Sequence, residues 1–325
     1  MITPAKWSYF VTNASTLIGQ AYSETPIISP KFSTTVPTDT EIFLDGWTGM
    51  LPQMVPWVGA RSTFEHAPQT YSVTVIPFQA TLLVDRFDLD DDKMGVYYRD
   101  LPDMARQAKR WQDLQIRNLL EGAYPWTGAY QNGLDGGTHW NTAHPVDLYD
   151  SSKGTYCNDF TGGGQMIGGV QVGGAFSGTA FATLYEYNAT LKAEDGESMD
   201  INPNLLLHPT ALKTETELTL KNMSWAPPSW GTITGQVGAA DNVFRRFGVE
   251  PLEFKLLSSR TKWYLFDTTK GVMPTRWILR QAPIFTQRTT EDDSLVFDMH
   301  RYAYGDWGRA AAAWSPAWLG ARSGP

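Results

Sequence analysis

Cysteine is nearly absent from this sequence, because the 325 residues include only one, Cys157. A single thiol cannot form a disulfide within the chain, so a disulfide-stabilised scaffold is excluded and a reducing compartment is the simpler expectation. None of the five histidines lies within ten residues of Cys157 in the sequence. This pattern favours an ordinary thiol over an activated nucleophile.

Long apolar runs are also missing. No apolar segment approaches the roughly 20 residues that a membrane-spanning helix needs, so we expect no membrane partner. The first 23 residues lack a basic start followed by an unbroken apolar stretch. We therefore expect no signal peptide at this end of the sequence.

Basic residues are too few for general nucleic-acid binding. The chain has 26 Lys and Arg against 34 Asp and Glu, which gives a formal net charge of −8. Because phosphate contacts need Lys and Arg, this balance argues against a protein that grips nucleic acid. It is compatible with a protein that encloses nucleic acid without adhering to it.

Signatures of catalysis and of cofactor binding are absent as well. The glycine-rich segment 161–174 lacks the Lys-Ser/Thr pair of a phosphate-binding loop, so we interpret it as a flexible or tightly turning loop. His139 and His144 have only Asp147 nearby as a further ligand, which is weak support for zinc. The sequence has no GxSxG, HExxH or paired CxxC motif. We expect no enzyme activity, no cofactor and no metal.

Aromatic residues and turn formers are abundant. Aromatics make up 13% of the chain, with 13 Trp, and there are 29 Gly and 20 Pro. The Gly and Pro content predicts many turns between short strands. The tryptophans could line a sugar-binding groove, or they could supply core and subunit contacts. The role in core and subunit contacts is favoured, because two segments of the chain need a surface beyond their own to pack against.

Those two segments come early in the sequence. Residues 1–45 predict an arm, since Pro and Ser/Thr are frequent and no helical period is visible, and such a segment needs a partner surface to become ordered. Residues 58–86 predict an extended hairpin of two strands. Within it Tyr71, Val73 and Val75 alternate onto one face, and Pro77 limits its strand to an edge or a bulge. A long hairpin with little core of its own is marginal alone.

The remaining elements predict an α+β fold. The strongest helix covers residues 98–124, with Asp100 as the expected N-cap and Pro102 in the first turn. A second helix is predicted over 177–195. A short buried strand is expected at 205–208, turning at Pro209 into another helix, and most of the later segments alternate as strands.

A cluster of aspartates stands between the predicted hairpin and the long helix. Its members are Asp85, Asp88, Asp90, Asp91 and Asp92. Counted from Asp88, an EF-hand would need Gly at the sixth position and Glu at the twelfth, but Lys93 and Arg99 stand there. A catalytic carboxylate pair cannot be recognised from sequence. The favoured interpretation is a solvated acidic turn ahead of a helix.

In order along the chain, these segments resemble the Mu-like phage major head subunit (gpT-type) family. One matching stretch has the form P-x-x-x-x-W-x-G-x-R, at Pro52, Trp57, Gly59 and Arg61. A second is VDRFDLDDDKMGVY, with Asp85, Arg86, Asp88, Asp91, Asp92, Gly95 and Tyr97 at the matching places. The long helix, the segments HWNTAHPVD and NPNLLLHPTAL, and the closing YAYGDWGRAAAAW continue the likeness. Two departures are Asn141, where the family has an acidic residue, and a longer glycine-rich loop over 150–174.

The resemblance implies the Hong Kong 97-type capsid fold. The arm would be 1–45 and the extended hairpin (E-loop) 58–86. The peripheral domain would comprise 46–57, 87–200 and 286–312, with its spine helix near 98–124. The axial domain would comprise 201–285 and 313–325. The candidate interface residues are Asp85, Arg86, Asp88, Asp91 and Asp92 at the joint of hairpin and spine, with Trp57 and Arg61 where the hairpin starts.

The function implied is that of a major capsid protein of a tailed double-stranded DNA phage or prophage. Its copies would form the pentamers and hexamers of an icosahedral head, located in the virion and assembled in the host cytoplasm. Expected partners are the chain itself, a portal, a scaffolding protein, decoration proteins, and packaged DNA without sequence-specific contact. Two alternatives stay open, an encapsulin-type nanocompartment shell protein and a β-rich carbohydrate-binding or hydrolytic protein. A minor tail or decoration protein is a weaker third.

Overall fold

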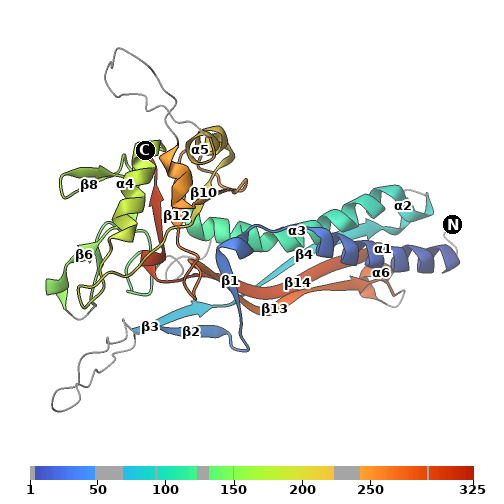
Figure 1. Cartoon of the computed structure of the whole chain (residues 1–325). Helices are drawn as coiled ribbons and strands as arrows, with labels where there is room; N and C mark the ends of the chain where they lie inside the picture. Colours follow the sequence, from blue (N-terminus) through green and yellow to red (C-terminus); the bar gives the residue numbers. More distant parts are fainter. Residues whose placement is uncertain are drawn as a thin grey trace.

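Two β-sheets organise the chain, and each forms the centre of one body of the molecule (Figure 1). The bodies share one hydrophobic core, in which Leu207 and Tyr264 of one sheet pack with Trp277 of the other. The computed structural model describes residues 4–47, 69–91, 94–122, 132–148, 150–222, 242–290 and 293–325. The elongated body contains a four-stranded sheet covered by two helices. The five-stranded body contains the second sheet, two shorter helices and several small hairpins.

The sheet of the elongated body has the strand order β1-β13-β14-β4. Its strands are β1 (Ser33–Pro37), β13 (Thr275–Arg288), β14 (Arg301–Trp314) and β4 (Ile76–Asp85). The two 14-residue strands β13 and β14 are antiparallel neighbours, joined at their far end through the short helix α6 (Ser294–Met299). β4 pairs antiparallel with β14 at one edge, and β1 pairs parallel with β13 at the other.

The 28-residue helix α3 (Met94–Glu121) lies along this sheet (Figure 1). Leu101, Ala105, Ile116 and Leu120 are fully buried, at spacings that place them on one helical face. The predicted helix 98–124 is therefore confirmed, although its predicted start is wrong. The helix begins at Met94 and continues through Pro102, where the proline ring removes one backbone donor from the helical ladder.

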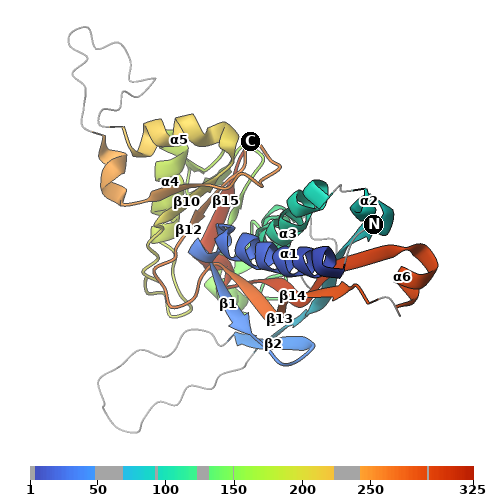
Figure 2. The same cartoon turned by 90° about the vertical axis from the view of Figure 1, so that its right-hand side faces the viewer.

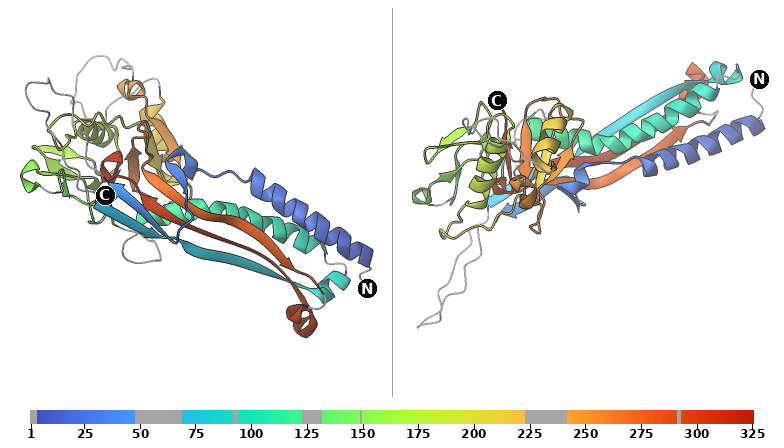
Figure 3. Two further views of the ribbon diagram at one scale, coloured as in Figure 1. Left: turned by 90° about the horizontal axis from the view of Figure 1, so that it is seen from below. Right: turned by 45° about the horizontal axis from the view of Figure 1, so that its top comes forward.

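The N-terminal segment differs from the predicted helix-free arm. Pro4–Glu24 forms helix α1, which lies beside α3 on the same side of the sheet (Figure 3). Ala14, Ile18 and Ala21 are buried, three and four residues apart, against α3 and β14 of the same chain. The small size of two of these residues made the helical period hard to recognise. β2 (Ile42–Trp47) and β1 follow α1 in the region that we predicted to be irregular.

The ribbon that leaves the elongated body is built differently from the predicted hairpin. β3 (Gln69–Thr74) pairs antiparallel with β2, so the first strand of the ribbon comes before residue 58. Residues 48–68 lie outside the described part of the chain. Tyr71, Val73 and Val75 are all buried, which confirms their predicted common face. Pro77 lies in the edge strand β4, as predicted.

The sheet of the five-stranded body has the order β11-β10-β12-β15-β7. The strands are β11 (Glu250–Glu253), β10 (Leu205–His208), β12 (Trp263–Phe266), β15 (Gly320–Ser323) and β7 (Asp159–Phe160). All four residues of β10 are buried, which confirms the predicted buried strand. Helix α5 (Lys213–Leu220) follows it. The short strands β5 (His144–Pro145) and β6 (Thr155–Tyr156) pair nearby, as do β8 (Gln165–Ile167) and β9 (Val170–Val172).

Helix α4 (Gly178–Ala189) packs against this second sheet. Ser177 caps its start, since the Ser177 hydroxyl accepts a hydrogen bond from the Ala180 amide at 3.1 Å. Phe181 and Leu184 share a core with Trp263 and Leu265 of β12. α4 lies before residue 200 and β13 begins at Thr275, so the two sheets do not follow the predicted boundaries at residues 200 and 286, and the division into peripheral and axial domains stays a prediction. Among the described helices none is long and apolar enough to cross a membrane.

One buried carboxylate connects the N-terminal segment to α3. Asp113 is 4% exposed, and its two oxygens accept hydrogen bonds from the amides of Ile28 and Ser29, each at 3.0 Å. These contacts fix the chain between α1 and β1.

We expect Asp113→Ala to lower the free energy of unfolding by about 2–3 kcal/mol, because the buried Ser29 amide and the partly buried Ile28 amide lose their acceptor. Chemical denaturation of the purified chain measures the change. Asp103→Ala is the matched control, since the Asp103–Arg106 pair is exposed and should contribute less than about 0.5 kcal/mol. Equal effects of the two substitutions would contradict this account.

Candidate assembly interface

The aspartate cluster lies at the far end of the elongated body. β4 ends at Asp85, and α2 (Arg86–Asp90) turns the chain toward α3. Figures 1 and 2 place α2, α6 and the start of α1 together at this end, which we call the distal tip. The Asp85 carboxylate accepts the Phe87 amide at 2.9 Å, and the Arg86 amide donates to the His300 carbonyl at 3.0 Å.

The predicted residues of the cluster separate into different environments. The Tyr97 hydroxyl donates to the Asp88 carboxylate at 2.9 Å and so connects α2 to α3. Partial burial, followed by this hydrogen bond, raises the pKa of Tyr97. Asp91 is exposed, and its amide donates to the Phe87 carbonyl. Asp85 and Asp88 therefore order the tip itself, whereas Asp91 faces outward.

Exposed apolar side chains gather at the same tip. Phe87 is 60% exposed, Phe297 77% and Met299 61%. The Phe87 ring lies 5.4 Å from the ring of His300, whose φ of +52° turns the chain from α6 into β14. Large apolar side chains that remain exposed together are typical of contact surfaces. Sequence reasoning missed this feature because most of the later segments were expected to be strands, and no helix was predicted over 294–299.

Three predicted residues lie outside the described part of the chain. These are Trp57 and Arg61 at the start of the hairpin and Asp92 of the cluster. Their predicted place in an interface stays a prediction.

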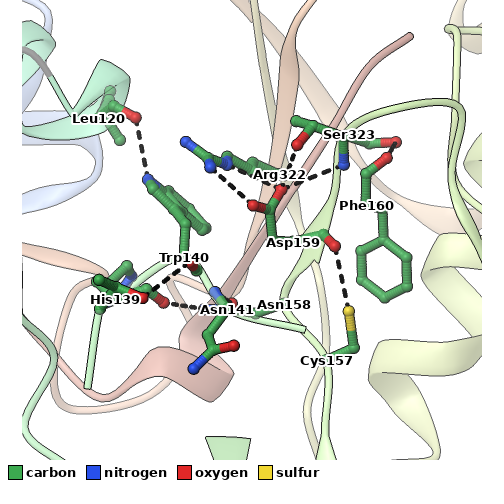
Figure 4. A network of polar contacts seen from close by, with 12 residues as sticks. Leu120, His139, Trp140, Asn141, Cys157, Asn158, Asp159, Phe160, Arg322 and Ser323 are labelled. Atoms are coloured by element: carbon green, nitrogen blue, oxygen red, sulfur yellow. Dashed lines mark hydrogen bonds and ion pairs between the residues drawn. The ribbon is translucent and has the colours of Figure 1, made fainter. Parts of the chain in front are cut away.

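A second polar cluster joins the two bodies (Figure 4). Arg322 of β15 donates two hydrogen bonds to Asp159 of β7, at 2.9 and 2.7 Å. Its guanidinium also lies over the Trp140 ring, 5.3 Å from the centroid. The Trp140 indole in turn donates to the Leu120 carbonyl at the end of α3, at 3.0 Å. The C-terminal strand is thereby connected to the long helix.

The Asp159 carboxyl is partly buried, and burial alone would raise its pKa. The hydrogen bonds and charge of Arg322, together with hydrogen bonds from Thr161, outweigh that effect and lower the pKa below its usual value. The carboxylate is therefore ionised throughout the neutral range. This bidentate pair is a structural connection and not an acid-base group.

The two histidines of this region make contacts that hold the surrounding structure together. His144 is fully buried, with Nδ1 2.6 Å from an Asp135 oxygen and Nε2 2.8 Å from the His139 carbonyl oxygen. The His139 ring stacks on Trp314 at 3.6 Å. Burial first, and then the charges of His144 and Arg322, hold the pKa of His139 well below its usual value. Within the described ranges no three potential ligand side chains are grouped to hold a metal ion.

Cys157 is buried, and its thiol donates to the Asp159 carbonyl at 3.2 Å. Burial raises the pKa of this thiol to about 11, so it stays protonated at neutral pH. A protonated, hydrogen-bonded thiol is a poor nucleophile, which fits the interpretation made from the sequence.

Comparison with known proteins matches most of the chain to one family. The model of the family described as "Mu-like prophage major head subunit gpT" matches residues 9–168 and 254–321. The major capsid protein of Escherichia phage Mu is 27% identical over 155 residues, which cover 48% of each chain. The Mu-like prophage FluMu major head subunit of Haemophilus influenzae is 26% identical over 116 residues, 36% of each chain. The chain therefore aligns with about half or less of these curated relatives.

Solved phage shells share the fold. The chain in the procapsid of bacteriophage JBD30 superimposes with a TM-score of 0.54 and 22% identity, covering 99% of this chain and 76% of that one. In a JBD30 capsid decorated with minor capsid protein trimers, the TM-score is 0.53 at 21% identity, over 72% of this chain and 91% of that one. The α+β fold of this chain is that of phage capsid proteins.

We expect Arg322→Met to lower the free energy of unfolding at pH 7 by about 3 kcal/mol, because Asp159 would remain charged and partly buried without its partner. Wild type gains this stability above the pKa of an unfolded Asp, near 4, and loses it as the pH falls through the lower folded pKa. Denaturation of both proteins at pH 7 and at acid pH should show the difference shrinking at acid pH. A difference that is independent of pH would contradict the assignment.

The double variant with Asp159→Asn, which removes the unpaired charge, should be less destabilised at pH 7.

Proposed function

This chain belongs to the Mu-like prophage major head subunit gpT family, and from that premise we propose that it is the major capsid protein of a tailed double-stranded DNA phage or prophage. Its copies would assemble into the pentamers and hexamers of an icosahedral head that encloses the genome. The family match over 9–168 and 254–321 carries this proposal. The family is one of structural head subunits and not of enzymes.

The two bodies suggest how the subunit is divided into domains. We assign the elongated body, with α3 as its spine, to the peripheral domain of a Hong Kong 97-type subunit. We assign the five-stranded body to the axial domain. The ribbon β2–β3 would be the root of the extended hairpin. This assignment places α4 and β7 in the axial domain and β13 in the peripheral domain, unlike the boundaries that the family resemblance implies.

The distal tip supports a contact with a neighbouring copy. Phe87, Phe297 and Met299 offer apolar area, and Asp91 and Asp298 place negative charge beside it. Apolar centres with polar rims are usual in protein interfaces. A heterologous contact, in which the tip of one subunit meets a different surface of the next, repeats around a ring until the ring closes. Basic side chains on the neighbouring surface would complement the aspartates.

The charge of the chain suits a container for DNA. A net charge of −8 gives packaged DNA little to adhere to, which supports enclosure without sequence-specific contact. A portal, a scaffolding protein and decoration proteins are the further partners proposed for this head. The decoration of the JBD30 capsid by minor capsid protein trimers supports the last of these. The protein would reside in the virion, after assembly in the host cytoplasm.

Electron microscopy of the full chain, produced alone and together with the proteins encoded beside it, tests the proposal. Closed shells of uniform size are expected, and particles recovered from virions should contain DNA. A chain that stays monomeric under all these conditions would refute the proposal, and shells that enclose a protein cargo and no DNA would indicate a nanocompartment.

We expect Asp91→Lys with Asp92→Lys to lower the yield of closed shells about tenfold, because a reversed charge would meet basic residues on the neighbouring copy. The melting temperature of the unassembled chain should change little, since Asp91 is exposed. Sedimentation and electron microscopy measure the yield. The control is Asp195→Lys with Glu197→Lys, in an exposed turn of the five-stranded body. Normal shells from the Asp91 and Asp92 variant would show that the cluster takes no part in the interface.

A further inference from the structure

A carboxylate is buried on the face of the long sheet that the helices cover. Tyr302, Tyr304 and Asp306 alternate along β14, so their side chains share this face. Asp306 is 3% exposed, and the neighbouring strands place the apolar residues Ala80 and Phe285 opposite it. Its Oδ1 atom has no hydrogen-bond partner in the described part of the chain. Buried polar atoms normally have partners, so this exception needs a reason.

Helix α1 covers this carboxylate. The Tyr22 ring, in the last turn of α1, lies edge to face with the Phe285 ring at 5.7 Å. Burial, followed by the nearby charge of Asp306, raises the pKa of the Tyr22 hydroxyl. Asp306 therefore lies under the C-terminal end of α1, where the helix excludes water from it.

No cation neutralises Asp306 within the described residues. The cation at this interface is Lys109 of α3, whose Nζ lies 4.7 Å from the centroid of the Tyr22 ring and forms no ion pair with Asp306 in the described ranges. The tyrosines of the surrounding core, from α1, α3 and β14, are neutral at physiological pH. Burial therefore raises the pKa of Asp306, an effect that a hydrogen bond from its own backbone offsets only in part.

The end of α1 that covers Asp306 is incompletely packed. A crevice of about 260 Å³ is lined by Tyr22, Lys109 and Leu279, among other residues. A second crevice, of about 270 Å³, is lined by Ile18 and Tyr304, among others. Crevices of this size forfeit contacts that a close-packed helix would make with the sheet. The apolar contacts of α1 are therefore few enough for one buried charge to affect its docking.

The chain that follows α1 is anchored independently of the helix. Because the Asp113 carboxylate holds the amides of Ile28 and Ser29, the segment 25–27 can act as a hinge while β1 keeps its place in the sheet. Rotation about this hinge would lift α1 from the sheet and expose Asp306 to water. Hydration would remove the cost of ionising the carboxyl group.

We infer that Asp306 makes the docking of α1 depend on pH, so that the protonated carboxyl group keeps the helix on the sheet and the ionised group favours its release. In the released state the pKa of Asp306 would have its usual value near 4, whereas in the docked state it is raised. Docking is therefore strongest below about pH 4 and weakens as the pH rises through the docked pKa. The inference concerns the single chain and does not depend on the proposed shell.

Thiol labelling of the purified, unassembled full chain tests this coupling. Ala21 is 6% exposed in the core that α1 shares with α3, so Ala21→Cys should react only when the helix leaves the sheet. Cys157 is buried and its thiol stays protonated at neutral pH. Asp306→Asn keeps the shape of the side chain and removes its charge. In the Ala21→Cys chain it should slow labelling at pH 7 about tenfold, the order of the cost of an unpartnered buried polar group.

The pH dependence of that difference identifies the charge as the cause. Dithiodipyridine reacts with thiols at acid pH as well, and the ratio of the two labelling rates cancels the titration of the thiol itself. This ratio should fall toward one as the pH approaches about 4. Asp298→Asn, which removes an exposed carboxylate of the same body, should leave the rate unchanged. Labelling of Ala180→Cys, buried in α4, should not respond to Asp306→Asn.

Hydrogen–deuterium exchange of the wild-type chain gives a second measurement, which decides the inference if Asp306→Asn does not fold. After correction for the intrinsic pH dependence of exchange, the amides of α1 should lose protection between about pH 5 and pH 8, whereas those of α4 should keep it. Equal labelling with and without Asp306→Asn at pH 7, a ratio that stays constant with pH, or constant protection of α1 would each overturn the inference. None of these measurements uses shells, so the proposed function is judged separately.

Discussion

The arrangement of the two bodies depends on the C-terminal end of α3, where Ile116 and Leu119 lie in a hydrophobic core shared by both sheets and polar bonds hold the end of the helix. The last carbonyls of a helix have no partner within the helix. Here the Leu120 carbonyl accepts the Trp140 indole, and the Glu121 carboxylate accepts the amides of Ser258 and Ser259 at 2.7 and 3.0 Å. These bonds connect a helix of the elongated body to loops of the five-stranded body. They set the direction in which the elongated body leaves the joint.

Such a joint matters because α3 acts as a lever. At about 1.5 Å per residue its 28 residues span roughly 42 Å, so a small rotation at Glu121 displaces the distal tip by several ångströms. A contact at the tip can recur identically in every copy only if this rotation is restricted. Trp140 ties the joint to Arg322 and Asp159, so the C-terminal strand also takes part in fixing the lever. Substitutions at Trp140, Arg322 or Asp159 can therefore move the tip although they change none of its own residues.

Local patterns in the sequence predicted those elements that the spacing or clustering of their apolar residues reveals. The long helix, the alternation of Tyr71, Val73 and Val75, and the buried strand at Leu205 were predicted in this way. Helix α1 was missed, because its buried side consists largely of small residues and packs against α3 and β14, which lie far along the chain. The pairing of β2 with β3 was missed because their sequence separation conceals it. The aspartate cluster was recognised, but only the geometry separates Asp88, bound to Tyr97, from the outward-facing Asp91.

The distribution of charge connects the two ends of the molecule. Copies that each carry a net charge of −8 repel one another weakly over their whole surface, so contacts between them need apolar area to offset that repulsion. Exposed apolar side chains occur at both ends as well as elsewhere, with Phe297 and Met299 at the distal tip and Met166 on the β8–β9 hairpin. Acidic residues accompany the first set and are absent around the second. A tip that meets a different surface gains from charge that is complemented there.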